Sequence, residues 1–116
     1  MKITSVKNML MAQNMERAVR FYVSTFALEL RIKGESRSEL AWGESIIALH
    51  GGHDGTEKRA SLILEVDDIM DATAQVQLNG GHILETPEER GPEPLIYAEF
   101  MDTEGNVVML TQPIGA

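Results

Sequence analysis

Cysteine is absent from this sequence, and so are long hydrophobic runs. Without cysteine the chain can form no disulfide, thiolate metal site or iron–sulfur cluster, and it has no thiol nucleophile. No segment approaches the roughly 20 consecutive apolar residues that a membrane-spanning helix needs. We therefore expect no membrane partner, and any bound metal would need His, Asp or Glu ligands.

Positive charge is also scarce. Ten Lys and Arg residues face 18 Asp and Glu residues, which gives a formal net charge of −8. The basic residues are scattered rather than grouped into a stripe, so we expect no nucleic acid partner. The N-terminus has no apolar stretch long enough for a secretory signal, which favours a cytoplasmic location.

The first half of the chain reads as a strand, a helix and three more strands. Asn14 is a natural N-cap, because its side-chain oxygen can accept from a free backbone N–H group. Apolar residues then recur at helical spacing at Met15, Ala18, Val19, Tyr22 and Phe26. The predicted strands are Ile3–Ala12, Leu28–Gly34, Arg37–Trp42 and Ile46–His50.

After a polar link at Gly51–Arg59 the same order returns. Asp68 is the second predicted N-cap, and Asn79-Gly80-Gly81 closes the second helix. The predicted strands are Ser61–Val66, His82–Glu85, Leu95–Met101 and Asn106–Thr111. The acidic link Thr86–Pro94 is predicted to be a solvated connector or a lid at the edge of a cleft.

The two halves form an internal repeat. One constant shift sets Leu10 on Leu64, Asn14 on Asp68 and Ala18 on Ala72. We predict one α+β domain over residues 1–116, built from two βαβββ modules at about 1–52 and 59–113. Each helix covers the outer face of its sheet, which leaves a concave sheet cleft between the modules.

A turn follows the strand that ends at Met101. Asp102-Thr103-Glu104-Gly105-Asn106 separates two apolar runs, so the segment predicts a β-hairpin. With the earlier helix "NMERAVRFYVSTFALEL", this element order resembles the vicinal oxygen chelate superfamily, which includes glyoxalase I, extradiol dioxygenases, and fosfomycin- and bleomycin-resistance proteins. The family's helix usually ends in Leu-Gly, whereas this chain has Phe26-Ala27.

The resemblance implies where a metal would bind. Carried over from the helix caps and the hairpin, the family's ligand positions fall on Lys7, Ala48, Ser61 and Met109. None of these residues suits the hard divalent ions that the family uses, and the Lys7 ammonium would repel a cation. We predict no metal and no other cofactor, and the metal-free branch of drug-binding proteins is the closer analogue.

Alternation along the strands predicts the residues of the cleft. Methionine suits variable apolar ligands, although core or dimer-interface packing is the alternative. Trp42 and Tyr97 offer flat surfaces for a planar ligand, although Trp42 could simply pack. The predicted ligand-binding residues are Lys7, Met9, Met11, Trp42, His50, Ser61, Glu65, Tyr97, Glu99, Met101 and Met109.

Lys7 is the most informative polar residue of this set. A lysine on a cleft wall needs a carboxylate or an anionic ligand, and Glu65 and Glu99 lie on the same predicted face. Lys7 and Glu99 are therefore the candidate catalytic residues if the protein transfers protons. His50 and His53 have a spacing that gives weak support for a metal, and solvated loop histidines are the alternative.

The sequence thus predicts a metal-independent protein that sequesters an apolar or aromatic small molecule in a Met-rich cleft. The alternative is a glyoxalase-like lyase or isomerase, or a dioxygenase-related enzyme. Such an enzyme would use displaced ligands such as His50, Glu65 and Glu99, or a Lys7 and Glu99 acid–base pair. The resemblance also implies a homodimer.

Overall fold

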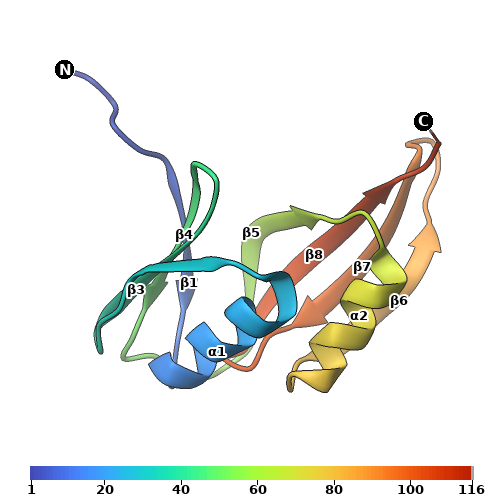
Figure 1. The fold of residues 1–116 in the computed structure, drawn as a ribbon. Helices are drawn as coiled ribbons and strands as arrows, with labels where there is room; N and C mark the ends of the chain where they lie inside the picture. Colours follow the sequence, from blue (N-terminus) through green and yellow to red (C-terminus); the bar gives the residue numbers. More distant parts are fainter. Residues whose placement is uncertain (116) are drawn as a thin grey trace.

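The computed structural model describes residues 1–115 and contains the two predicted βαβββ modules side by side (Figure 1). The first module comprises β1 (Lys7–Met11), α1 (Met15–Phe26), β2 (Glu29–Ile32), β3 (Arg37–Trp42) and β4 (Ser45–His50). The second comprises β5 (Lys58–Glu65), α2 (Ile69–Leu78), β6 (His82–Glu89), β7 (Leu95–Met101) and β8 (Asn106–Pro113). The predicted α+β fold and its repeat are confirmed.

Both sheets have the same strand order, as expected for a repeat. The first runs β1-β4-β3-β2 and the second β5-β8-β7-β6. The first strand of each module pairs in parallel with the last, and the remaining neighbours are antiparallel. Residues that are partners in this register share a face of the sheet, so Met9 and Ala48 lie on one face and Leu10 and Leu49 on the other.

The core lies between the sheets and the two helices. Both helices lie on the same side of the sheets and next to each other (Figure 1). Phe21 and Tyr22 of α1 are almost fully buried and form an aromatic cluster with Phe26 and Phe100. Burying each such side chain stabilises the fold by roughly 1.5–3 kcal/mol. No helix among residues 1–115 is long and apolar enough to cross a membrane.

The predicted helix starts are confirmed by their capping bonds. The Asn14 side chain accepts from the backbone N–H of Arg17 at 3.0 Å, and the Asp68 side chain accepts from that of Asp71 at 3.0 Å. Helix α1 ends at Ala27, which has a left-handed φ of 56° and donates its N–H to the Val23 carbonyl. Glycine usually holds this position.

Several predicted strand ends were wrong. Strand β1 begins at Lys7 rather than Ile3, and residues 1–6 extend away from the body without pairing (Figure 1). Strand β5 begins at Lys58 rather than Ser61, because Lys58 already pairs with Asn106. Strand β6 continues to Glu89 through the predicted connector, because an edge strand tolerates a proline such as Pro87.

Candidate functional site

Lys7 lies on the face of the first sheet that is turned away from helix α1. Its ammonium donates to Glu39 Oε2 at 2.8 Å, and Arg37 donates to the same oxygen. The predicted partners Glu65 and Glu99 were therefore wrong. Ala48 separates β1 from Glu39 in the register, and its small side chain lets Lys7 reach across β4.

The Glu39 carboxylate is the buried member of this cluster. Only 6% of its side chain is exposed, against 36% for Lys7. The hydrogen bond from Lys7, with further attraction from Arg37, lowers the pKa of Glu39 below its ordinary value. A carboxylate held by two cations is favoured in its ionised form, and Lys7 is engaged by it rather than free to act as a general base.

The second sheet carries a comparable pair on the corresponding face. Arg59 donates to both oxygens of Glu99, with distances of 2.5 and 3.2 Å. Glu99 is also the register partner of Met109, which in turn pairs with Ile63. Lys7 and Glu99 thus belong to separate ion pairs, and the two candidate catalytic residues do not contact each other.

A groove lies between the two modules where β1 approaches β5. Its volume is about 430 Å³, and we call it the central groove. Among the residues predicted to bind a ligand, it gathers Lys7, Met9, Met11 and Ser61. Met109 lines a smaller adjoining hollow that shares Ser61 with it. The complete lining of the central groove is Lys7, Asn8, Met9, Met11, His53, Lys58, Arg59, Ala60, Ser61, Leu62 and Asn106.

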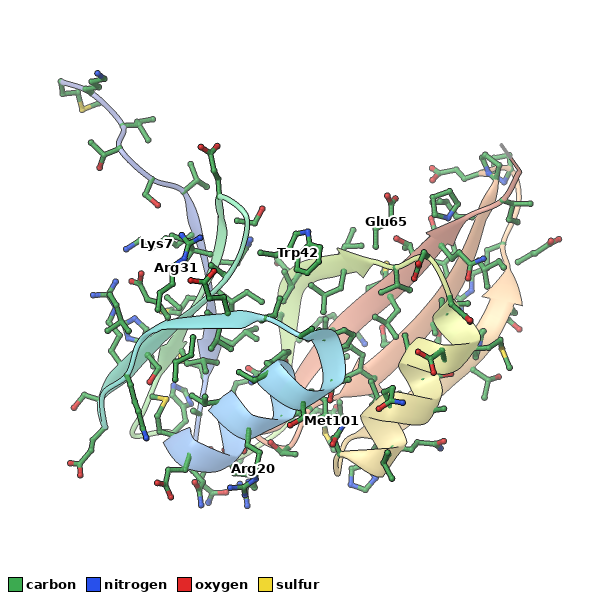
Figure 2. All side chains as sticks on the ribbon, in the orientation of Figure 1. Lys7, Arg20, Arg31, Trp42, Glu65 and Met101 are labelled. Atoms are coloured by element: carbon green, nitrogen blue, oxygen red, sulfur yellow. The ribbon has the colours of Figure 1, made fainter. Side chains whose placement is uncertain are left out.

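Other predicted site residues lie outside the central groove. Trp42 and Glu65 line a separate hollow between the end of α1 and the start of α2. Met101 lines a third hollow, between the helices and the turn after β7, and Figure 2 places it far from Trp42 and Glu65. Alternation assigned each residue to a face, but it could not say at which end of a strand the residue would lie.

His50 and Tyr97 are also outside the groove. His50 is exposed at the end of β4, and the half-buried Tyr97 donates its hydroxyl to Glu93 at 3.3 Å. No single hollow among the described residues therefore gathers the whole predicted set, whose common role in binding a ligand stays a prediction. No three His, Asp or Glu side chains of the described chain lie close enough together to hold a metal ion. His50, Glu65 and Glu99 consequently do not form the displaced metal site considered above.

The turn between β7 and β8 holds the two walls of the central groove together, through a contact that the sequence did not predict. The Asn106 side chain accepts from the Met11 N–H at 3.2 Å and donates to the Met11 carbonyl at 2.7 Å. This two-point contact acts as a strand pairing across the module boundary. Both Met11 and Asn106 line the central groove, so the bond pair sets the distance between its walls.

Glu104, in the same turn, holds the start of α1. Its side chain is fully buried and accepts from the backbone N–H groups of Gln13 and Asn14 at 2.9 and 2.7 Å. Arg17 adds an ion pair at 2.7 Å. Burial acts to raise the pKa of Glu104, but the bonds from Arg17, Asn14 and Thr103 outweigh it and hold the pKa below 4.5. A carboxylate suits this place because a helix N-terminus is electropositive.

Asp102 completes the network under the turn. It accepts from the buried Tyr22 hydroxyl at 2.6 Å and from the side chain of Asn106 at 2.8 Å. Burial raises the pKa of Asp102 despite these bonds, and burial next to Asp102 raises the pKa of Tyr22 well above 10.0. The residues of the turn are therefore structural, and they join the second module to the first helix.

Comparison with models of protein families shows to which superfamily this chain belongs. Residues 3–110 match the model of the glyoxalase/bleomycin resistance protein/dioxygenase superfamily. The chain belongs to this superfamily. No curated protein matches it in sequence.

Solved structures of the superfamily fold support the same architecture. TioX from Micromonospora sp. ML1 is 18% identical with a TM-score of 0.76, over 97% of this chain and 100% of that one. The fosfomycin resistance protein FosX from Listeria monocytogenes is 13% identical with a TM-score of 0.78, over 100% and 96%. An integron cassette protein from V. cholerae is 24% identical with a TM-score of 0.66, over 97% of each chain. At these identities the likeness concerns the fold alone.

In metal-dependent members of the superfamily, a divalent ion binds at the positions that correspond to Lys7, Ala48, Ser61 and Met109. The residues that this chain has at these positions do not suit such an ion. A methyl group, a hydroxyl, a thioether and an ammonium supply no carboxylate or imidazole. Two carboxylates lie beside them, and both are already engaged: Glu39 is held by Lys7 and Arg37, and Glu99, the register partner of Met109, is held by Arg59. Unit charges roughly 4 Å apart repel by about 4 kcal/mol at an effective dielectric of 20, so the Lys7 ammonium opposes any cation there.

Proposed function

We propose that this superfamily member binds a small, largely apolar or aromatic molecule in the central groove without a metal ion. The ion pair of Lys7 with Glu39 is the observation that carries the proposal. It puts a positive charge at the position where metal-dependent members would hold a cation, and it uses the nearby carboxylate. Together with Met109 at the position of a metal-binding glutamate, it supports a pocket for an organic ligand.

The exposed apolar side chains near the groove support an apolar ligand. Met9 is 52% exposed and Ile63 is 59% exposed, while Met109 is half-buried beside Ile63. Covering 100 Å² of such surface would contribute roughly 2.5 kcal/mol. The flexible, polarizable methionine side chains can adapt to ligands of different shape. The groove volume of about 430 Å³ also falls in the usual range of small-molecule sites.

One solved relative points in the same direction. FosX is described as a fosfomycin resistance protein, so at least one protein with this fold is associated with resistance to a small molecule. A cytoplasmic location and a homodimer stay predictions. The exposed Met9 and Ile63 are consistent with a partner subunit over the same face, and sedimentation velocity would give the oligomeric state.

Thermal stabilisation by aromatic compounds tests the proposal. The purified protein is heated with bleomycin and with a broad set of aromatic compounds, because a ligand that binds only the folded state raises the melting temperature. The Met9→Gln variant should lose the stabilisation. The matched control Met70→Gln changes a methionine that is 66% exposed on α2, away from the groove, and should keep it.

Three results would overturn the proposal. The first is an absence of stabilisation by every compound. The second is stoichiometric Ni, Zn, Mn or Fe in protein purified without a chelator, which would indicate a metal-dependent lyase, isomerase or dioxygenase. Equal stabilisation of Met9→Gln and wild type would place the ligand elsewhere on the chain.

A further inference from the structure

The central groove has an electrostatic character opposite to that of the chain. The protein has a formal net charge of −8, yet Lys7, Lys58 and Arg59 line the groove together with His53. No Asp or Glu of residues 1–115 is among the lining residues. In an acidic protein, a concentration of positive charge at one groove needs a reason, because repulsion between the cations disfavours it.

Lys58 has only neutral acceptors. Its ammonium donates to the carbonyl oxygens of Thr56 at 2.8 Å and Glu104 at 3.0 Å. It forms no ion pair with a carboxylate of the described chain, and its third hydrogen remains available. The half-buried position holds the side chain in place, so a cation is fixed at the groove without a counter-charge in contact.

Of the other two cations, Arg59 is neutralised by a carboxylate and Lys7 only in part. Arg59 has its own carboxylate in Glu99, whereas Lys7 shares the single carboxylate of Glu39 with Arg37. Two positive charges on one carboxylate leave an excess of one. Lys7 also uses one of its three donor hydrogens for Glu39, and its side chain is 36% exposed.

We infer that the central groove recognises the anionic head group of its ligand, a carboxylate or a group of the same charge. Lys7 and Lys58 supply the charge, while Met9 in the groove and Ile63 and Met109 in the adjoining hollow contact the apolar body of the ligand. This inference rests on the proposed function, and it narrows the ligand class from apolar or aromatic molecules to organic acids with an apolar body. A charge-assisted hydrogen bond from an unused N–H of Lys7 or of Lys58 gives the selection for the acid over a neutral analogue.

Matched acids and amides test this inference. Calorimetric titrations compare 2-naphthoate with 2-naphthamide, and octanoate with octanamide, in 50 mM and 300 mM NaCl. Each pair keeps the apolar body and changes only the charge. We expect each acid to bind at least tenfold more tightly than its amide, and the difference to shrink at the higher salt concentration because exposed charges are screened.

Charge-removing variants place the effect in the groove. Lys7→Met and Lys58→Met should each lower the affinity for the acids at least fivefold. Both variants should keep the affinity for the amides within twofold of wild type. The control Arg20→Met removes an exposed cation of α1 that lies outside the groove. This variant should bind the acids and the amides with the same affinities as wild type. Circular dichroism of each variant confirms that it is folded.

The outcomes separate the inference from the proposed function. Equal affinity for acid and amide would overturn the anionic head group and leave an apolar binding protein. An equal loss of acid affinity in Arg20→Met would also overturn it, because the effect would then come from overall charge. If neither acids nor amides nor the aromatic compounds of the thermal test bind, both proposals fail.

Discussion

Glu104 gives the sharpest test of how the two modules are joined. We expect the change Glu104→Gln to destabilise the fold by about 2–3 kcal/mol, since one hydrogen bond to a charged group contributes about 1.5–3 kcal/mol. One oxygen of Glu104 serves the N–H groups of Gln13 and Asn14, and the other accepts from Arg17 Nε and Thr103. A glutamine side chain has one acceptor oxygen, which can serve the N–H groups of Gln13 and Asn14. Its NH₂ group would then replace the second oxygen, and this donor would face the donor N–H of Arg17.

The size of this effect follows from the burial of the pair. Breaking a fully buried ion pair costs about 3–5 kcal/mol. Glu104 is fully buried, but the Arg17 side chain is 39% exposed and water can replace part of what it loses. We therefore place the cost of Glu104→Gln at or just below the bottom of that range, at about 2–3 kcal/mol. For a domain of this size, about 2–3 kcal/mol corresponds to a fall of roughly 8–12 °C in Tm.

Urea unfolding at pH 7 followed by circular dichroism measures the change. The control Glu44→Gln alters an exposed glutamate in the turn between β3 and β4, and should stay within about 0.5 kcal/mol of wild type. A loss below about 1 kcal/mol in Glu104→Gln would refute the structural role given to this network.

The pH dependence of the same variant adds a second check. Because the pKa of Glu104 is held below 4.5 in the folded protein, its contribution is present above pH 4.5 and is lost as pH falls through the lowered pKa. The stability difference between wild type and Glu104→Gln should therefore be constant from pH 6 to 8 and shrink below pH 4.5. A difference that stays constant down to pH 3 would contradict the ion pair.

Three further substitutions test local features by urea unfolding. Tyr22→Phe removes the hydroxyl bonded to buried Asp102 and should cost about 1–2 kcal/mol, whereas no loss would mean that the bond is not formed. Ala27→Gly relieves the left-handed cap of α1 and should stabilise by about 0.5–1 kcal/mol, and a destabilised variant would contradict that geometry. Gly105→Ala should cost more than 2 kcal/mol, because φ is 90° and a Cβ would lie 2.6 Å from two carbonyl oxygens. The control Gly43→Ala shares a positive φ but meets no atom within 4 Å, so an equal cost in both would refute the steric argument.

Most of the fold could be predicted from the sequence because its signals are local. The caps Asn14 and Asp68, the helical spacing and the hairpin glycine each report on a few neighbouring residues, and the repeat supplied every element twice. The ends of strands depend on distant partners instead. Lys58 is in a strand because Asn106 lies beside it, and the preceding link gave no sign of this pairing.

The site was less predictable for the same reason. Alternation placed Lys7 and Met9 on the correct face, but the partner of Lys7 depends on β3 being next to β4 and on the small side chain of Ala48 between them. Lys58 and Arg59 were assigned to a polar link and so were missed as lining residues. The turn glutamate Glu104 looked like ordinary turn chemistry, because its partners precede it by most of the length of the chain.

Ligand binding before and after chelation tests the central claim most directly. Calorimetric titration with 2-naphthoate is run on the protein as purified and again after dialysis against EDTA. We expect the same affinity and about one site per chain in both, because Lys7 and its neighbours rather than a metal form the groove. Binding that disappears on chelation and returns with added Ni, Zn, Mn or Fe would contradict the claim.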